Sequence, residues 1–446
     1  MPQEQVEPNP GGRVVDNDPH SLPIAAEAAT MKVRDRSPSQ EHQRNSVGYH
    51  PCSTFSLTWL LDPVKPRDFH ELHYESAPLW VSRSQIGYFA DLPSLDEVDD
   101  LLTTTVSNRL SPADGERLTR SEPDGTSSDY NVRMTGNGAA DVQAVYRSYH
   151  DGFTVVINQM HRRSAAVGRL CRRLQAVLHH PVGANLYLTP ANAQGFRPHV
   201  DMHDVFILQL HGTKEWHVSS PSIELPLVSS RHGKQSLPDF QTYTLAPGDT
   251  LYLPRGYRHE AVTGDSSSLH LTVGVHAIRW HDLLKDALAL LAEEDVIFRS
   301  ALPVGYPEKP LDTGQVRDMA RRVSVALSDG KLMEKAKERV TSRLISADVT
   351  TGLSRFRSLD AIAGMSDESI VARPSEILCL VRLTPDRATI EFAGNFVTGP
   401  RFLAPALQFI AQNDQFTVSD LPGNLSKGDR MDLVKRLVTE GLLEVL

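Results

Sequence analysis

The chain has 446 residues, which exceeds one ordinary hydrophobic core and predicts two or three domains. Hydrophobic residues at 40% and charged residues at 23% are typical of a soluble globular protein and exclude a disordered or collagen-like chain. A formal net charge of −9 gives the whole molecule no electrostatic footprint for wrapping nucleic acid, so direct nucleic-acid binding is not expected, although a local basic patch stays open.

The N-terminal segment, residues 1–50, is predicted to be a disordered leader. It mixes Pro, Glu, Gln, Asp and Arg and lacks the apolar stretch of a secretory signal. No run of about 18 apolar residues occurs in the chain, so no membrane contact is predicted. Cys52, Cys171 and Cys379 are widely spaced and odd in number, which argues against a disulfide framework and a zinc knuckle. The predicted location is the reducing cytoplasm.

Short helices and strands are expected in the first part of the ordered chain. Helices are predicted at 55–61, 95–102 and 167–178, and strands at 77–81 and 153–157. Residues 103–137 are rich in Asp, Gly, Ser and Arg and offer almost no apolar period, so they are predicted to be a mobile insertion or loop. In the third helix, Arg169, Arg172 and Arg173 are expected on the solvated side, opposite the apolar stripe.

A series of strand-like runs separated by turn signals fills the middle of the chain. Strands are predicted at 185–188, 205–210, 215–218, 241–245, 251–253 and 269–275. The turns between them include Gly212-Thr213 and the Pro-Gly-Asp at 247–249. Short strands at this spacing indicate an all-β sandwich or barrel.

Helices dominate after Trp280, and the chain ends in a smaller mixed unit. Helices are predicted at 283–291, 316–327 and 331–344, then a hairpin at 377–383 and 388–392, and helices at 402–412 and 431–438. This last unit suggests a winged-helix module. Residues 402–446 hold four basic and six acidic side chains, so a scaffold or protein-contact role is favoured over DNA binding.

His199 and Asp201 carry the strongest chemical signal in the chain. Residues i and i+2 of an extended strand project from the same face, so the imidazole and the carboxylate can meet one ion. His259 would complete the set from a distant strand. Two imidazoles and one carboxylate on one side of a metal leave its other positions open, which is the arrangement that non-haem Fe(II) oxygenases use.

Other histidines compete for these roles. His203 lies at i+4 from His199, so an uninterrupted strand would aim it at the same ion, where it could replace His259. The Pro-Gly-Asp, Leu-Tyr-Leu-Pro and histidine order at 247–259 is a cupin-type pattern and favours His259. The remaining histidines of the β-rich region are expected to be structural: His211, His217, His232 and His276.

Several motifs identify a family. Asn-Leu-Tyr-Leu-Thr-Pro at 185–190, Gly-Phe at 195–196, His-Val-Asp-Met-His-Asp-Val-Phe-Ile-Leu-Gln-Leu at 199–210 and Gly-Thr-Lys-Glu-Trp at 212–216 closely resemble the ribosomal oxygenases. These are cupin-like JmjC proteins that hydroxylate histidine or arginine side chains of ribosomal proteins. The resemblance runs from about Phe55 to the C-terminus. It implies an α+β protein that uses Fe(II) and the co-substrate 2-oxoglutarate, with a helical homodimerisation region and a winged-helix end.

The resemblance also assigns residues. It places the iron ligands on His199, Asp201 and His259, in agreement with the strand geometry. Lys214 is implied to pair with the distal carboxylate of 2-oxoglutarate, a contact that contributes roughly 1.5 to 3 kcal/mol. By itself, a lysine after a glycine turn would be an ordinary exposed side chain.

The same resemblance assigns three further site residues. Tyr187 and Thr272 are implied to add hydroxyl contacts to the co-substrate, and Asn185 to face the substrate. The chain also departs from relatives, because Gly274 stands where some carry serine, which puts one substrate hydrogen bond in doubt. Lysine rather than arginine at position 214 favours a histidine target.

Three further residues lie near the predicted site in the sequence: Trp216, Arg255 and Arg258. Trp216 is expected to pack in the core. The two arginines beside His259 are expected either to solvate the rim of the site or to hold an acidic substrate segment.

The sequence therefore predicts four regions. They are a leader at 1–50, a JmjC/cupin catalytic domain with a double-stranded β-helix core at 51–280, a helical dimerisation region at 281–373 and a winged-helix domain at 374–446. The predicted activity is hydroxylation of a histidine or arginine side chain in a protein, ribosomal by resemblance, or in a peptide. Two alternatives stay open: an N-methyl-lysine demethylase, and a non-catalytic cupin that holds zinc or nickel and acts as a regulator.

Overall fold

The computed structural model describes the backbone of Met31–Lys32 and the residues 55–104, 115–122, 124, 126–133, 140–221, 223–227, 237, 239–347 and 355–446. Apart from strand β1 (Met31–Lys32), the predicted leader at 1–50 lies outside the described residues. Cys52 also lies outside them, and the two cysteines within them, Cys171 and Cys379, are free thiols.

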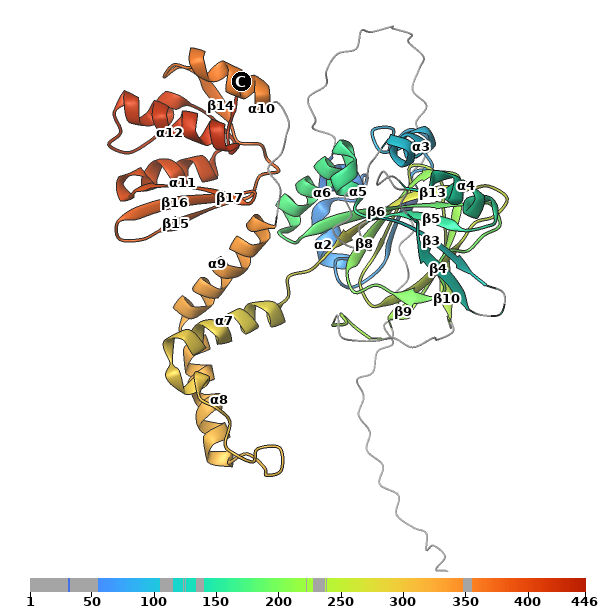
Figure 1. The fold of residues 1–446 in the computed structure, drawn as a ribbon, viewed down its shortest axis with the longest axis horizontal. Coiled ribbons are helices and arrows are strands. Elements are labelled where there is room, and N and C mark those ends of the chain that lie inside the picture. The colour runs from blue at the N-terminus through green and yellow to red at the C-terminus, as the bar shows by residue number, and fades with distance from the viewer. Residues whose placement is uncertain are drawn as a thin grey trace, which may run out of the picture.

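Two largely antiparallel sheets form the β-rich unit (Figure 1). The larger sheet has the order β1-β2-β11-β8-β13-β6-β5-β3-β4, with β2 (Leu79–Ser82), β3 (Glu116–Ser121), β4 (Ser127–Asn131), β5 (Thr154–Ile157), β6 (Val182–Thr189), β8 (Asp204–His211), β11 (Thr250–Leu253) and β13 (Ser268–Val275). The smaller sheet has the order β10-β9-β12-β7, with β7 (His199–Val200), β9 (Lys214–Pro221), β10 (Phe240–Leu245) and β12 (Tyr257–Val262). The six strands predicted between 185 and 275 are all present.

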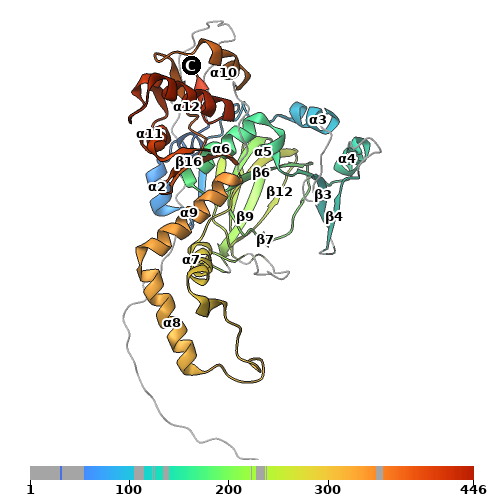
Figure 2. The ribbon, with the colours of Figure 1, turned by 60° about the vertical axis from the view of Figure 1, so that its left-hand side comes forward.

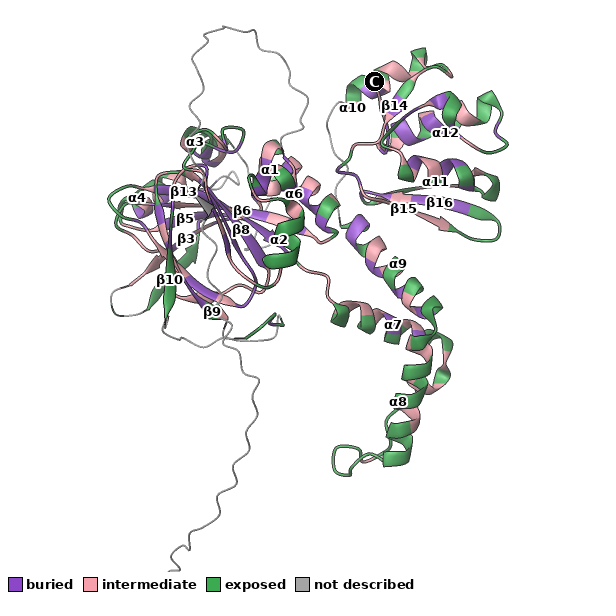
Figure 3. Cartoon of the chain, turned by 180° about the vertical axis from the view of Figure 1, so that it is seen from behind, coloured by how far each residue is buried: buried purple, intermediate pink, exposed green. Residues whose placement is uncertain are grey.

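Alternation along the central strands divides the core from the functional face. On β13, Leu271 and Val273 are fully buried in the main hydrophobic cluster, whereas Thr272 and Gly274 line a cavity on the other face. Figure 3 shows the same contrast between the buried strands and their exposed surroundings. Because successive side chains of a strand point to opposite faces, one strand supplies both surfaces.

Six helices pack around the larger sheet or beside it: α1 (Leu57–Leu61), α2 (Pro66–Leu72), α3 (Leu95–Thr104), α4 (Val142–His150), α5 (Met160–Arg163) and α6 (Ala165–Leu178). The apolar stripe of α6 joins the same hydrophobic cluster as β6 through residues such as Leu170 and Leu174. Its three arginines, which were predicted to be solvated, are only partly exposed. Arg173 Nε lies 3.9 Å from Glu376 Oε2.

The prediction of a loop at 103–137 is wrong for the part that the structure describes. There β3 and β4 form a hairpin, and β3 continues the sheet by pairing with β5. Leu118 is fully buried, and the buried Glu116 carboxylate accepts a hydrogen bond from Arg163 at 2.6 Å. Ladder hydrogen bonds and this buried ion pair hold a strand whose sequence has little apolar period, which explains why the pattern did not reveal it. The other residues of that range lie outside the described residues.

Three helices follow the β-rich unit: α7 (Trp280–Glu294), α8 (Thr313–Ser328) and α9 (Gly330–Ser346). They lie to one side of the sheets in Figure 1, and α8 projects below the β-rich unit in Figure 2. Ala287 and Leu291 of α7 pack against Leu332 and Ala336 of α9 in a small core of their own.

The C-terminal unit has its own core and two small sheets. Its elements are α10 (Arg355–Ala361), β14 (Ile370–Ala372), β15 (Cys379–Leu383), β16 (Arg387–Phe392), β17 (Asn395–Pro400), α11 (Ala404–Gln412), β18 (Gln415–Thr417), α12 (Lys427–Glu440) and β19 (Glu444–Val445). The strand orders are β15-β16-β17 and β18-β14-β19. The predicted hairpin and both helices are present, and β17 was not predicted. Gly441 ends α12 with a φ of 94°.

In the described residues, short 3₁₀ turns occur at Val296–Arg299, Ile362–Gly364, Arg401–Leu403 and Val418–Asp420. Among the described helices, none combines the length and the apolar character needed to cross a lipid bilayer.

Gly212 forms the turn that carries the chain from β8 into β9. Its φ is +61°, and a Cβ at this position would lie 1.8 Å from the Ser267 carbonyl oxygen. Gly212→Ala should therefore destabilise the protein by about 2 kcal/mol or more, seen as a lower Tm in a circular-dichroism melt. Gly264→Ala is the matched control, because a Cβ there meets no heavy atom within 4 Å. Equal melting temperatures for the two variants would contradict this account of the turn.

Candidate metal centre

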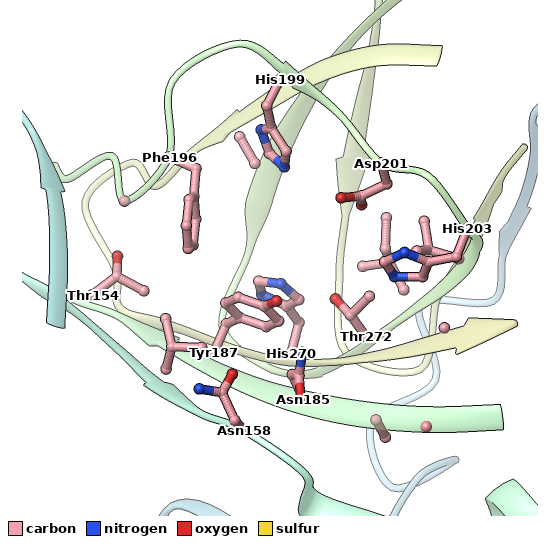
Figure 4. Close-up of a pocket in the computed structure, with 18 of the residues that line it drawn as sticks. Thr154, Asn158, Asn185, Tyr187, Phe196, His199, Asp201, His203, His270 and Thr272 are labelled. Carbon is pink, nitrogen blue, oxygen red and sulfur yellow. The ribbon is translucent and has the colours of Figure 1, made fainter. Parts of the chain in front are cut away.

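A cavity of about 470 Å³ lies between the two sheets and contains every site residue predicted from the sequence (Figure 4). These residues are Asn185, Tyr187, His199, Asp201, Lys214, His259 and Thr272. They come from five strands or their ends, so the fold gathers side chains that are far apart along the chain.

His199, Asp201 and His259 converge on one point in the cavity wall. One ligand atom from each lies within 4.8 Å of the others, and His259 Nε2 is 3.6 Å from Asp201 Oδ2. Antiparallel pairing of β7 with β12 places His199 directly opposite His259. The backbone carbonyl of Asp201 accepts a hydrogen bond from Gly256 N at 3.1 Å, which fixes the aspartate beside the same strand.

Backbone carbonyls orient both imidazoles. His199 Nδ1 lies 2.8 Å from the Arg197 oxygen, and His259 Nδ1 lies 3.0 Å from the Tyr257 oxygen. A neutral imidazole that donates from Nδ1 keeps the Nε2 lone pair free, and ligand histidines of metal sites are held in this way. The three side chains can therefore present two nitrogens and one oxygen to a divalent cation.

The protonation states of these groups also suit a metal. Burial, followed by the neighbouring His199, lowers the pKa of His259 to about 4, so its ring is neutral near pH 7. Burial would raise the pKa of Asp201, but His199 and His259 outweigh it and hold the pKa below its usual value. A neutral imidazole and an ionised carboxylate are the forms that bind cations.

His203 does not join this set, because the strand that carries His199 ends at Val200 and the chain bends at 202–203. The i+4 alignment assumed for an uninterrupted strand is therefore lost. Its ring instead stacks on His276, with centroids 4.7 Å apart and an interplanar angle of 24°. Figure 4 shows His203 to one side of Asp201.

The four histidines that were expected to be structural differ in their surroundings. His211 is exposed at the end of β8, and His217 lies between the carboxylates of Glu215 and Glu260. His276 lines the cavity, which the sequence did not indicate. His232 lies outside the described residues.

The cavity floor is a two-strand grid on β6 and β13. Cross-strand pairs join Thr189 to Ser268, Tyr187 to His270, Asn185 to Thr272, and Gly183 to Gly274. The rings of Tyr187 and His270 stack face to face at 4.8 Å. Asn185 Oδ1 accepts a hydrogen bond from the Gln159 backbone at 3.0 Å. Burial raises the pKa of Tyr187 to about 12, so its hydroxyl keeps its proton.

Lys214 is buried at one end of this floor rather than exposed on its turn. Its exposed fraction is 5%, and its Nζ donates to Thr189 Oγ1 at 2.8 Å. Within the described residues no carboxylate forms an ion pair with it. Burial lowers the pKa of Lys214 to about 7. The buried ring nitrogens Trp216 Nε1 and His270 Nδ1 nearby also lack hydrogen-bond partners. Buried polar atoms are normally paired, so this end of the cavity suits an anion.

His270 and the cavity-facing edge of Trp216 are therefore additional site residues. Trp216 was expected only to pack in the core; it does so and also lines the cavity. The signal for His270 was its position two residues before Thr272, which places both on one strand face.

The two arginines near His259 do not solvate the rim, because both are buried. The backbone N–H of Arg255 donates to Asp204 Oδ1 at 2.8 Å, and its guanidinium contacts the carboxylates of Asp204 and Glu75. Burial raises the pKa of Asp204 to about 6. This network ties the segment after Asp201 to the turn before His259.

A family model of the JmjC domain matches residues 157–283, the stretch that holds all seven predicted site residues. The chain carries a JmjC domain. The "Bifunctional lysine-specific demethylase and histidyl-hydroxylase NO66" of Drosophila pseudoobscura pseudoobscura is 34% identical over 292 residues, covering 64% of this chain and 30% of that protein. Ribosomal oxygenase 1 of Gallus gallus is 36% identical over 259 residues, covering 55% of this chain and 41% of that protein. The predicted resemblance is confirmed.

The similarity to these proteins covers only part of their length, and the similarity to a solved structure concerns the fold. The chain spans less than half the length of these two curated relatives. The structure of YcfD, a ribosomal oxygenase from Escherichia coli in complex with cobalt and 2-oxoglutarate, superposes with a TM-score of 0.53 at 16% identity, over 86% of this chain and 98% of that one. The JmjC/cupin fold and the α+β class are confirmed. The dimerisation region and the winged helix stay predictions.

The buried Lys214 should lower the stability of the ligand-free protein. Its folded pKa of about 7 lies below the ordinary 10.5, so the unfolded chain binds more protons and stability should rise as the pH increases between these values. Lys214→Met removes a cost on the order of 2 to 4 kcal/mol near pH 7, and should raise Tm there, with the gain shrinking toward pH 10.5.

The control for this measurement is Lys309→Met, since Lys309 is exposed. Melting curves across the pH range compare the two variants with the unaltered protein. A Lys214→Met protein that melts like the Lys309→Met protein at pH 7 would contradict a buried, uncompensated ammonium.

Proposed function

We propose that this protein is an Fe(II)- and 2-oxoglutarate-dependent oxygenase that hydroxylates a histidine or arginine side chain of a protein. The observation that carries the proposal is one cavity with two complementary parts. It combines a cluster of two imidazoles and one carboxylate with a buried lysine that has no carboxylate partner among the described residues. The first set suits a ferrous ion and the second suits a dicarboxylate.

Each residue has a proposed task. His199, Asp201 and His259 would hold iron from one side and leave its remaining positions toward the cavity. When iron and 2-oxoglutarate are bound, they would supply the chemistry by which O₂ oxidises a substrate C–H bond. Lys214 would bind the distal carboxylate of the co-substrate, in a position where burial strengthens the attraction.

The remaining cavity residues would position the reactants. Tyr187 and Thr272 would donate hydroxyl hydrogen bonds to the co-substrate, and Asn185 would face the substrate. Trp216 and the stacked Tyr187–His270 pair would exclude water from the co-substrate end.

The substrate class rests on relatives. Two proteins with about one third of their aligned residues in common with this chain are named a histidyl-hydroxylase and a ribosomal oxygenase. We propose a ribosomal protein as substrate, with lysine at position 214 favouring histidine over arginine as the target. N-methyl-lysine demethylation is the second candidate, because the first of these relatives is also named a lysine-specific demethylase.

We propose that the helices after the β-rich unit form a homodimer interface. Large apolar side chains are exposed along the segment that contains α7 and α8: Trp280, Val296, Leu302, Val304, Leu311, Val316 and Val325. Figure 3 shows how little of this segment is buried within one chain. Apolar surface on this scale marks a surface for protein contact.

We further propose that residues 374–446 are a winged-helix domain with a scaffold or protein-contact role. The excess of acidic over basic residues in 402–446 supports a protein partner rather than nucleic acid. We also propose that the protein is located in the cytoplasm.

Removing a proposed iron ligand should abolish turnover. His199→Ala and Asp201→Ala each delete one of three ligands and should reduce conversion of 2-oxoglutarate to succinate to background. The exposed His211→Ala is the matched control and should keep full turnover. Intact masses of ribosomal proteins from cells with the unaltered protein should show a gain of one oxygen atom that is missing in cells with either ligand variant.

Other outcomes of this experiment separate the alternatives. Full turnover in both ligand variants would contradict the ligand assignment. Formaldehyde release without a stable gain of oxygen would identify a demethylase. Protein purified without oxygen that contains zinc or nickel and forms no succinate would identify a non-catalytic cupin.

The proposed dimer makes a separate prediction. Analytical ultracentrifugation at micromolar concentration should show a dimer for the unaltered protein and a monomer for the Val304→Glu, Val325→Glu double variant, because buried carboxylates at an apolar interface cost several kcal/mol. His211→Glu is a control that adds a charge at an exposed position of the β-rich unit, outside the proposed interface. A monomeric unaltered protein would contradict the interface.

A further inference from the structure

Two glycines face each other at the end of the cavity floor that is remote from Lys214. Gly183 of β6 and Gly274 of β13 are cross-strand partners. A Cβ at 274 would lie 2.5 Å from His203 Cδ2 and 2.8 Å from His203 Nε2, while one at 183 would lie 3.3 Å from His161 Cε1. Imidazole rings therefore occupy the space in which side chains of these strands would otherwise stand.

His203 is held in this space by stacking rather than by hydrogen bonds. Its ring lies against His276 at 4.7 Å, and both line the cavity. In the part of the chain that the structure describes, neither imidazole has a hydrogen-bond partner. The ring nitrogens of His203 are consequently available to a ligand, only two residues along the chain from Asp201.

The cavity has two chemically different ends. Along β13, His270, Thr272 and Gly274 project in one row, so its two ends are roughly 13 Å apart at 3.3 Å per residue. The first end holds Lys214 and suits an anion, whereas the second holds the stacked histidines beside Gly274. If the co-substrate occupies the first end, the side chain to be oxidised must approach through the second.

We propose that His203, stacked on His276 in the space left open by Gly274, is a specificity-determining residue that hydrogen-bonds the substrate side chain beside Asp201. This inference rests on the proposed oxygenase function. A ring nitrogen at this point pairs with the N–H of a planar side chain, an imidazole or a guanidinium, and the ring face packs on it. A trimethylammonium group has no N–H and cannot make this hydrogen bond. The hydrogen bond that Gly274 puts in doubt is thereby supplied by the neighbouring segment.

The first test compares variants on a defined probe. The probe is a set of synthetic peptides tiled through ribosomal proteins. Mass spectrometry detects a gain of oxygen in the presence of iron and 2-oxoglutarate. Fluorescence anisotropy measures peptide binding with manganese and N-oxalylglycine in their place. His203→Ala should weaken peptide binding about tenfold, while the Kd of 2-oxoglutarate changes less than about twofold. His211→Ala is the surface control and should bind the peptide within about threefold of the unaltered protein, because His211 is exposed at the end of β8.

The second test asks whether positions 203 and 274 share one space. Gly274→Ala should displace His203, because its Cβ would lie 2.5 Å from His203 Cδ2, and should weaken peptide binding about as much as His203→Ala does. The double variant should show no additional loss, because residues that share one space give strongly non-additive effects. Additive losses would overturn the inference.

The outcomes separate this inference from the function on which it rests. No 2-oxoglutarate turnover and no modified peptide with the unaltered protein would overturn both. Normal turnover with equal peptide binding by the unaltered and His203→Ala proteins would overturn only the role of His203. An equal loss of 2-oxoglutarate and peptide binding in His203→Ala would also overturn it, since the residue would then act through the metal site.

Discussion

The pairing of two short strands at the edge of the smaller sheet is the constraint on which the site depends. β7 contributes only two residues to this ladder, yet its register places His199 opposite His259. Backbone carbonyls then fix both rings with their Nε2 atoms toward Asp201. A slip of one residue would turn each side chain to the other face of the sheet and separate the ligands. The buried Arg255 network beside this ladder resists such a slip.

The second constraint is the unequal polarity of the cavity floor. Strand alternation lets β6 and β13 bury an apolar face in the core and offer the other face to the cavity. Lys214 and two unpaired ring nitrogens lie at one end, and stacked histidines over paired glycines lie at the other. Burying an ammonium without a carboxylate partner destabilises the empty protein, so this end is built for a ligand rather than for stability. In the proposed function, the same polarity would orient co-substrate and substrate relative to the metal centre.

Local sequence patterns were sufficient for much of the fold and the site. Alternation and turn signals predicted the strands between 185 and 275, and helical spacing predicted α6 to α9, because both depend on near neighbours. The i, i+2 relation of His199 and Asp201 is likewise local. The hairpin of β3 and β4 escaped prediction because Glu116 is buried through an ion pair with Arg163 rather than through apolar periodicity. Arg255 was assigned to the rim for the same reason, since its partner Glu75 is remote in sequence.

By itself, the sequence determined which chemistry was available: the ligand types, the strand faces that carry them, and the family that arranges them in this order. Only the tertiary structure decided between His259 and His203, because that choice depends on where β7 ends and which strand pairs with it. The tertiary structure also decided that Lys214 is buried and that His203 fills the space over Gly274. Such contacts join segments far apart in the chain, and their distances follow from packing and register, which no local pattern encodes.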